Sequence, residues 1–141
     1  MRVLLAVISI SCLVVSPALA CKILDNPPVT FARAAKQNSH CVDVYLSYTE
    51  KRGKLEATVP RLIIQSANGF GLSAELYTIR SKFREGEAVA YFCLSENALR
   101  EAKIIIEYWD LTIPEDAWIC EQRIELDQLD KLLAASDAEK K

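Results

Sequence analysis

Few side chains in this sequence could carry out catalysis. His40 is the only histidine, so any arrangement of a nucleophile, a histidine and an acid would have to use it. No Gly-x-Ser-x-Gly motif and no glycine-rich phosphate loop is present in the sequence. His40, Cys41 and Asp43 are metal-binding residue types, but neighbouring residues on a strand point to opposite sides. We therefore predict no metal site, no cofactor and no histidine-dependent catalysis.

Carboxylates are the remaining route to catalysis. A glycoside hydrolase needs two of them, held roughly 5–10 Å apart. Five acidic residues lie on or beside predicted strands and could converge: Asp43, Glu56, Glu75, Glu107 and Asp110. Their spacing singles out no pair, and solvent-facing positions of half-exposed strands explain them equally well. We therefore predict a protein that is not an enzyme, with a carboxylate-dependent hydrolase as the last alternative.

The first twenty residues predict export. A positively charged start precedes an apolar run over residues 3–15, and Ala18-Leu19-Ala20 supplies the small residues of a cleavage site. We predict a signal peptide over residues 1–20, cleaved after Ala20, and a periplasmic or secreted protein. Cys21 would then come first, so one alternative is a lipoprotein held at the membrane by acylated Cys21. An uncleaved N-terminal anchor is the other alternative.

Four cysteines remain after this cleavage, and an even number in an oxidising compartment predicts two disulfides. They are Cys21, Cys41, Cys93 and Cys120. We expect local pairing, Cys21 with Cys41 and Cys93 with Cys120, with each bridge worth on the order of 3 kcal/mol. The main rival pairs Cys41 with Cys93. An inter-sheet bridge of that kind would need Cys41 to face the core, whereas the alternation described next places it on the opposite face.

The chain after residue 20 is predicted to be mostly β-strand. Residues 41–49 alternate strictly, which puts Val42, Val44, Leu46 and Tyr48 on one face. Further strands are expected over 55–65, 70–79, 88–94, 103–109 and 117–126. In these, Pro60 implies an edge strand or a bulge and Asn68-Gly69 predicts a hairpin. Phe70, Leu72, Ala74 and Leu76 should share a face, and Trp118, Cys120, Ile124 and Leu126 should face inward.

Helical patterns are short. Ser95 is a candidate N-cap for one or two turns over 95–102. Leucines at helical spacing, Leu126, Leu129, Leu132 and Leu133, predict a C-terminal helix on a sheet edge. We therefore predict an antiparallel β-sandwich over 21–126, followed by a C-terminal helix and tail over 127–141. A small antiparallel barrel is the alternative.

The segment Glu87–Cys93 resembles the sixth strand of an immunoglobulin domain. In that strand a tyrosine two residues before the cysteine forms the tyrosine corner, and Tyr91 and Cys93 occupy these positions. The resemblance is confined to this segment, because Leu55 stands where an immunoglobulin tryptophan would follow Cys41. It implies an immunoglobulin-like sandwich as an analogy of architecture.

Two surface features predict binding. Arg80, Lys82, Phe83 and Arg84 place an aromatic ring in a basic loop, and phenylalanine and arginine are enriched at interfaces. If Ile104, Ile106 and Tyr108 face the core, then Ile105, Glu107 and Trp109 face outward and could form a partner surface. The alternative for the second feature is burial under the C-terminal helix.

Composition narrows the choice of partner. The 141 residues include 17 basic and 19 acidic side chains that are interspersed, which excludes a nucleic-acid-binding charge balance. We predict an exported protein-binding module, most concretely an inhibitor or immunity-type protein that occludes an exported hydrolase. A second copy of the chain is another candidate partner. The alternative is a carrier of a small ligand or glycan that uses aromatic residues of a sheet face.

Overall fold

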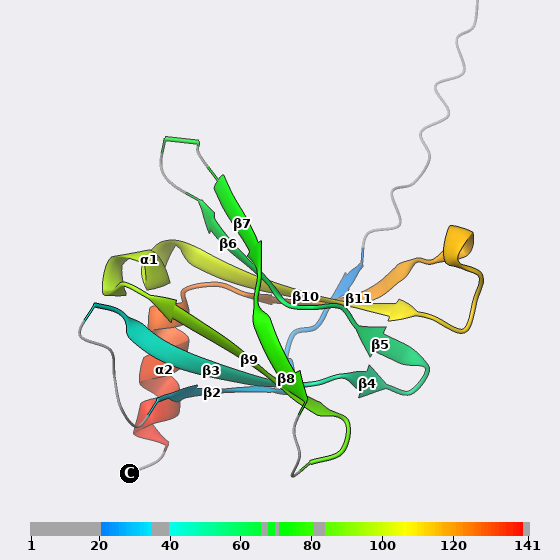
Figure 1. Cartoon of the computed structure of the whole chain (residues 1–141), viewed down its shortest axis with the longest axis horizontal. Helices are drawn as coiled ribbons and strands as arrows, with labels where there is room; N and C mark the ends of the chain where they lie inside the picture. Colours follow the sequence, from blue (N-terminus) through cyan, green and yellow to red (C-terminus); the bar gives the residue numbers. More distant parts are fainter. Residues whose placement is uncertain (1–20, 35–39, 66–67, 70, 81–83, 140–141) are drawn as a thin grey trace, which may run out of the picture.

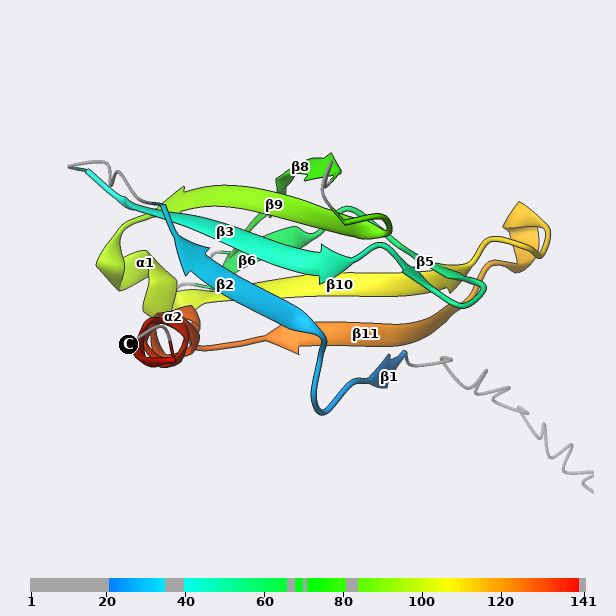
Figure 2. The ribbon, with the colours of Figure 1, turned by 90° about the horizontal axis from the view of Figure 1, so that it is seen from below.

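The computed structural model describes residues 21–34, 40–65, 68–69, 71–80 and 84–139. Within them the chain forms two β-sheets that lie against each other, with two short helices at one end (Figures 1 and 2). The predicted β-sandwich is confirmed, and the sheets do not close into a barrel. The predicted signal peptide, Phe70, Lys82 and Phe83 lie outside the described residues.

Sheet A has seven strands. Its main path runs β1 (Lys22–Ile23), β11 (Cys120–Leu126), β10 (Ala102–Asp110), β5 (Leu55–Ala57) and β4 (Lys51–Arg52). The first half of β10 pairs instead with β6 (Arg61–Gln65), which carries β7 (Gly71–Glu75) as a projecting hairpin (Figure 1). The β1–β11 pair is parallel, in contrast to the antiparallel prediction, and the other pairs are antiparallel.

Sheet B has four strands in the order β2 (Val29–Arg33), β3 (Val42–Thr49), β9 (Glu87–Leu94) and β8 (Tyr77–Arg80). All of its pairs are antiparallel. The central place predicted for residues 88–94 is confirmed, because β9 lies between β3 and β8. This arrangement leaves β8 as one edge of the sheet and β2 as the other.

The core lies between the sheets and follows the predicted alternation. From β3, Val44 and Leu46 are fully buried, and from β10 Ile104, Ile106 and Tyr108 meet them. The Tyr108 hydroxyl donates to the carbonyl oxygen of Thr49 at 2.7 Å, which satisfies the polar group of this buried ring. Burial raises the pKa of Tyr108 to about 12, so the hydroxyl stays protonated and the bond persists at physiological pH.

Residues 70–79 do not form the single strand that was expected. β7 pairs with β6 in sheet A, whereas β8 pairs with β9 in sheet B, so the chain changes sheets between them. Leu76 is buried at this change and its N–H donates to the carbonyl of Pro60 at 2.8 Å. The predicted common face is therefore wrong: Leu76 enters the core while Leu72 is 62% exposed. Pro60 lies in a break that divides residues 55–65 into β5 and β6, and each of these strands pairs on both sides, so the edge strand or bulge predicted from Pro60 is not what forms.

The helices lie at one end of the sandwich (Figure 2). In α1 (Glu96–Glu101) the predicted cap is confirmed, because the Ser95 Oγ accepts the Ala98 N–H at 3.2 Å. The predicted edge packing is also confirmed, since α2 (Leu129–Ala138) packs on the edge strand β2 and on α1. Within the described residues, no helix combines the length and the apolar character needed to cross a bilayer.

The last strand starts later than predicted. A single 3-10 turn, η1 (Glu115–Ala117), occupies the expected beginning, and β11 starts only at Cys120. Trp118 is therefore outside the strand and partly exposed, so its predicted inward orientation is wrong. Ile124 and Leu126 face the core as expected. Cys120 is also buried, but it lies on the other face of sheet A beside Trp109, so its predicted inward orientation is wrong.

Two disulfides are present, as predicted, but the expected local pairing is wrong. Cys21 pairs with Cys120, and Cys41 pairs with Cys93, at Cα–Cα distances of 5.2 and 5.6 Å. In the β3–β9 register Cys93 is opposite Asp43, and Asp43 is two residues after Cys41. This bridge therefore joins neighbouring strands of one sheet. It needs no core-facing cysteine, which is why the argument against an inter-sheet bridge did not exclude it.

Candidate functional site

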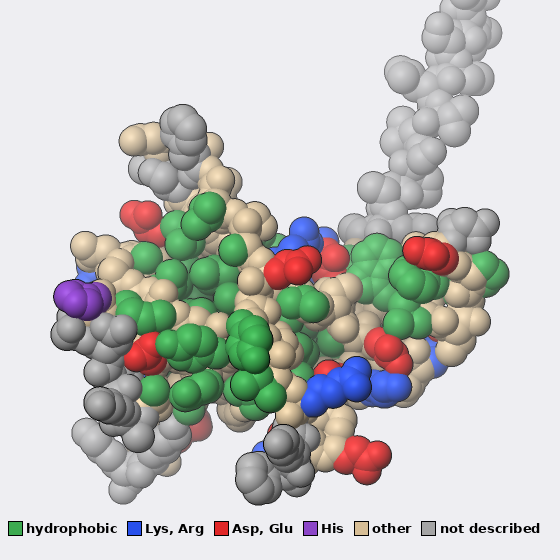
Figure 3. All heavy atoms as spheres, in the orientation of Figure 1, with side chains coloured by type: hydrophobic (Ala, Val, Ile, Leu, Met, Phe, Trp, Pro, Cys, Tyr) green, Lys and Arg blue, Asp and Glu red, His purple; other side chains and the backbone are tan. Residues whose placement is uncertain are grey.

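Three tyrosines lie in a row on the outer face of sheet B. Tyr45 in β3 is opposite Tyr91 in β9, and Tyr91 is opposite Tyr77 in β8. Directly opposed residues of neighbouring strands project from the same side of a sheet, so the rings are adjacent. Ile79 follows on the same side, and these four side chains are between 37% and 70% exposed. We call Tyr45, Tyr77, Tyr91 and Ile79 the tyrosine face; hydrophobic side chains gather over β3, β9 and β8 in Figure 3.

One member of the tyrosine face is fixed by a buried acid. The Tyr91 hydroxyl donates to Asp43 Oδ1 at 2.5 Å, and this hydrogen bond raises the pKa of Tyr91. The ring centroids of Tyr45 and Tyr91 are 5.5 Å apart at a tilt of 44°. A shallow groove of about 380 Å³ runs beside these rings. The Tyr91 hydroxyl therefore bonds to Asp43 on the outer face of sheet B and does not form the immunoglobulin-type tyrosine corner.

The tyrosine face reaches an open sheet edge. β8 is the last strand of sheet B, and no strand among the described residues pairs with its outer side. An exposed edge strand with apolar side chains is a template for pairing with another chain. Tyr77 and Ile79 are two residues apart in β8 and project from the same side, so a strand added at this edge would lie next to both side chains.

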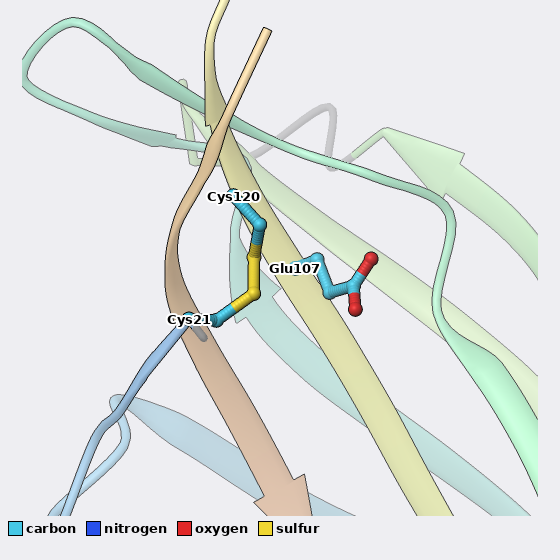
Figure 4. A group of neighbouring side chains, drawn as sticks. All are labelled: Cys21, Glu107 and Cys120. Carbon is cyan, nitrogen blue, oxygen red and sulfur yellow. A yellow bond between two sulfur atoms is a disulfide. The ribbon is translucent and has the colours of Figure 1, made fainter. Parts of the chain in front are cut away.

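A second groove lies on the outer face of sheet A. It has a volume of about 590 Å³ and combines two indole rings, two isoleucines, a disulfide and a pair of charges. We call it the tryptophan groove; its lining residues are Cys21, Ile23, Glu107, Trp109, Trp118, Ile119, Cys120 and Arg123. Figure 4 shows the Cys21–Cys120 disulfide beside the Glu107 side chain.

Charges in the tryptophan groove are compensated by one another. Arg123 donates to Glu107 through Nη2 and to Glu125 through Nη1, and Arg61 approaches Glu107 at 3.4 Å. Two buried donors in the groove, Trp109 Nε1 and Arg123 Nε, have no hydrogen-bond partner among the described residues. Both donor atoms are shielded from the groove surface, and the Arg123–Glu107 pair leaves the groove without a net charge of its own.

The predicted partner surface of Ile105, Glu107 and Trp109 is only partly present. Ile105 is 7% exposed, so it is not available to a partner and that prediction is wrong. Its neighbours across the sheet are Arg61 and Glu125, and the stems of long charged side chains cover apolar neighbours in this way. Trp109 is half-buried and lines the tryptophan groove. The C-terminal helix packs on β2, so it is not the cover that was considered for this surface.

The described part of the predicted basic loop is compensated by acids. Arg80 is exposed and pairs with Glu50 at 3.2 Å, and Arg84 pairs with Glu87 at 3.5 Å. Arg80 directly follows Ile79 in β8, so its side chain projects to the other side of the strand from the tyrosine face. Lys82 and Phe83 are outside the described residues, and their contribution stays a prediction.

The five candidate carboxylates do not share one groove. Asp43 is on the outer face of sheet B beside the tyrosine face, whereas Glu107 is in the tryptophan groove of sheet A. Asp110 accepts from Lys54 at 2.5 Å and from Thr112, which lowers its pKa to about 2. Glu56 pairs with Lys51, and Glu75 is exposed on β7. Each of the two grooves therefore contains only one of the five acids.

Two clusters have metal-ligand residue types, Cys21 with Glu107 and Cys120, and Cys41 with Asp43 and Cys93. Each cluster contains both cysteines of a disulfide, and a disulfide sulfur is not the thiolate that binds metals. His40 is exposed ahead of β3 and belongs to neither cluster. The clusters are consequently explained by the disulfides.

No protein-family model, curated protein or solved structure matches the chain. The inference of function therefore rests on the chemistry of the two outer faces of the sandwich.

Proposed function

We propose that this chain is an exported protein-binding module whose partner binds the tyrosine face. The observation that carries the proposal is the row of three exposed tyrosines ending at the open edge of β8. Tyrosine is enriched at binding hot spots, because it offers a large ring and a hydroxyl with little loss of side-chain entropy. The two disulfides support an oxidising compartment, which fits export of the chain.

The proposed contact is an extended segment of the partner protein that adds to β8 as a further strand. Backbone hydrogen bonds at an open edge supply affinity in this mode, and neighbouring side chains supply specificity. The acid beside the rings, Asp43, is buried and bonded to Tyr91, so the exposed contact is largely uncharged. We therefore expect an apolar or aromatic side chain of the partner to lie over Tyr77 and Ile79.

The most concrete form of this function is an inhibitor or immunity-type protein that occludes an exported hydrolase. Three of the candidate carboxylates are held in ion pairs with Lys51, Lys54 and Arg123, which supports a binding role over a hydrolytic one. The small size of the chain and its two disulfides also fit a compact secreted inhibitor. A lipid anchor on Cys21 would need its thiol free, whereas Cys21 is bonded to Cys120, and this supports the unanchored form of the proposal.

A pull-down with matched variants tests the proposal. The chain from residue 21, tagged after Lys141, is used to capture proteins from the envelope and medium of the source cells without reductant. Tyr77→Ala is compared with Leu72→Ala, which removes an equally exposed apolar side chain from β7 outside the tyrosine face. We expect one stoichiometric partner whose recovery is at least about tenfold lower with Tyr77→Ala, as for a hot-spot residue.

The outcome with Leu72→Ala decides how the result is interpreted. Equal loss in both variants, or full retention by Tyr77→Ala, contradicts binding at the tyrosine face. Recovery of the folded chain alone contradicts the protein-binding function itself. If the captured partner is an enzyme, its activity should fall to zero at one equivalent of this chain, and unchanged activity contradicts the inhibitor form.

A further inference from the structure

We infer that the tryptophan groove is a second binding site and that its ligand is a neutral saccharide. This site is on the outer face of sheet A, so it is separate from the tyrosine face on sheet B. The inference rests on two properties of the groove: its compensated charges and its aromatic walls.

The compensated charges select a neutral ligand. Arg123 is bonded to Glu107 and Glu125, so an anion entering the groove would meet carboxylates already in place. A cation would meet Arg123 and Arg61. A hydroxyl group both donates and accepts a hydrogen bond, and it can therefore bond to the arginine and to the carboxylate together. A row of hydroxyls is the arrangement that suits such alternating charged groups.

The aromatic walls select a ligand with a flat apolar face. The Trp118 ring is partly exposed and is held in place by its Nε1, which donates to the carbonyl of Ile113 at 3.0 Å. The face of an aromatic ring carries a partial negative charge, which attracts the weakly positive C–H groups on the face of a pyranose ring. Ile23 and Ile119 extend this apolar wall. A sugar ring provides both the C–H face and the hydroxyls.

Tryptophan fluorescence gives a direct test, because Trp109 and Trp118 are the only tryptophans and both line the groove. The disulfide-bonded chain from residue 21 is titrated with maltotriose, cellotriose, chitotriose and, as a charged comparison, trigalacturonic acid. We expect a saturable change in emission with at least one of the neutral trisaccharides, with a dissociation constant below about 1 mM. Trp118→Ala should weaken this binding at least about tenfold while Trp109 still reports it.

The controls separate this inference from the proposed function. Tyr77→Ala should bind the saccharide as the wild type does, because the tyrosine face is on the other sheet. The inference is overturned if none of the neutral trisaccharides gives a saturable change up to about 10 mM. It is also overturned if Trp118→Ala binds normally, if only the charged trisaccharide binds, or if N-acetyl-leucine amide binds more tightly than every saccharide. The pull-down result is unaffected by any of these outcomes.

Discussion

Asp110 is a buried carboxylate that is kept ionised by three hydrogen bonds. Lys54 Nζ donates to one of its oxygens, and the backbone N–H and hydroxyl of Thr112 donate to the other. These partners hold its pKa at about 2, below its usual 3.8. A carboxylate whose pKa is depressed by folding adds stability above its unfolded pKa and loses that contribution as the pH falls toward the folded value.

Replacing Asp110 should therefore remove a pH-dependent part of the stability. We expect Asp110→Asn to lower the urea midpoint at neutral pH, and the difference from the wild type should shrink as the pH falls from about 4 to about 2. Urea unfolding at several pH values measures this. Asp127→Asn, at an exposed carboxylate after β11, is the control and should show no such trend. A difference between wild type and Asp110→Asn that does not change with pH would contradict the assignment.

At the level of elements, α1 is a short helix whose stability depends on its first turn. Ser95 caps it through Oγ, and Leu99 places the helix against the core with a fully buried side chain. We expect Ser95→Ala to lower the free energy of unfolding by about 1 kcal/mol, because the Ala98 N–H loses its acceptor. Ser95→Asp should retain most of the stability. Urea unfolding measures both, and an equal loss in the two variants would show that the cap is not the cause.

Local patterns predicted those elements whose structure local interactions decide. The alternation in β3, the cap at Ser95 and the hairpin at Asn68-Gly69 were all found, since each depends on residues close in sequence. The change of sheets at Leu76 was missed, because it depends on β6 and β9 as pairing partners. The sequence pattern within residues 70–79 does not indicate which sheet each half of the segment joins.

The candidate site was missed for the same reason. The alternation predicted that Tyr45 faces away from the core, but a binding surface needs neighbours on other strands. Tyr91 and Tyr77 come opposite it only through the β3–β9 and β9–β8 registers, which the sequence did not provide. Conversely, Ile105 was assigned to the correct face of β10 but not to its correct exposure, because Arg61 and Glu125 flank it from adjacent strands.

At the level of the whole molecule, the disulfides tie distant parts of the chain together. The predicted local pairing favoured short loops, whereas the sandwich places β1 beside β11, so Cys21 lies next to Cys120. The observed bridges span sequence separations of 99 and 52 residues. In the chain-entropy model, bridges over loops of this length are worth about 4 to 5 kcal/mol each, more than the local pairs would be. Each is a large share of the stability of a typical domain.

Removing the two bridges should have distinguishable effects. We expect Cys21→Ser/Cys120→Ser to lose about 4 kcal/mol of stability and to shift the native tryptophan emission to longer wavelength, because Cys21 and Ile23 line the tryptophan groove. Cys41→Ser/Cys93→Ser should lose a similar amount without that shift, since its bridge lies on sheet B. Urea unfolding and native emission spectra measure both effects. An equal spectral shift in the two double variants would contradict the placement of the groove.

The Cys41–Cys93 pair lies within the segment that the Cys21–Cys120 pair encloses. This nested pairing has a consequence for disulfide formation during biosynthesis. Residues emerge from the ribosome N-terminus first, and the proposed export would keep this order, so Cys41 can meet Cys21 before Cys120 has emerged. A chain oxidised in order of emergence would join these consecutive cysteines and would then need thiol–disulfide exchange, which takes seconds to hours, to reach the native pairs. Production of the native chain should therefore depend on delayed oxidation or on a disulfide isomerase.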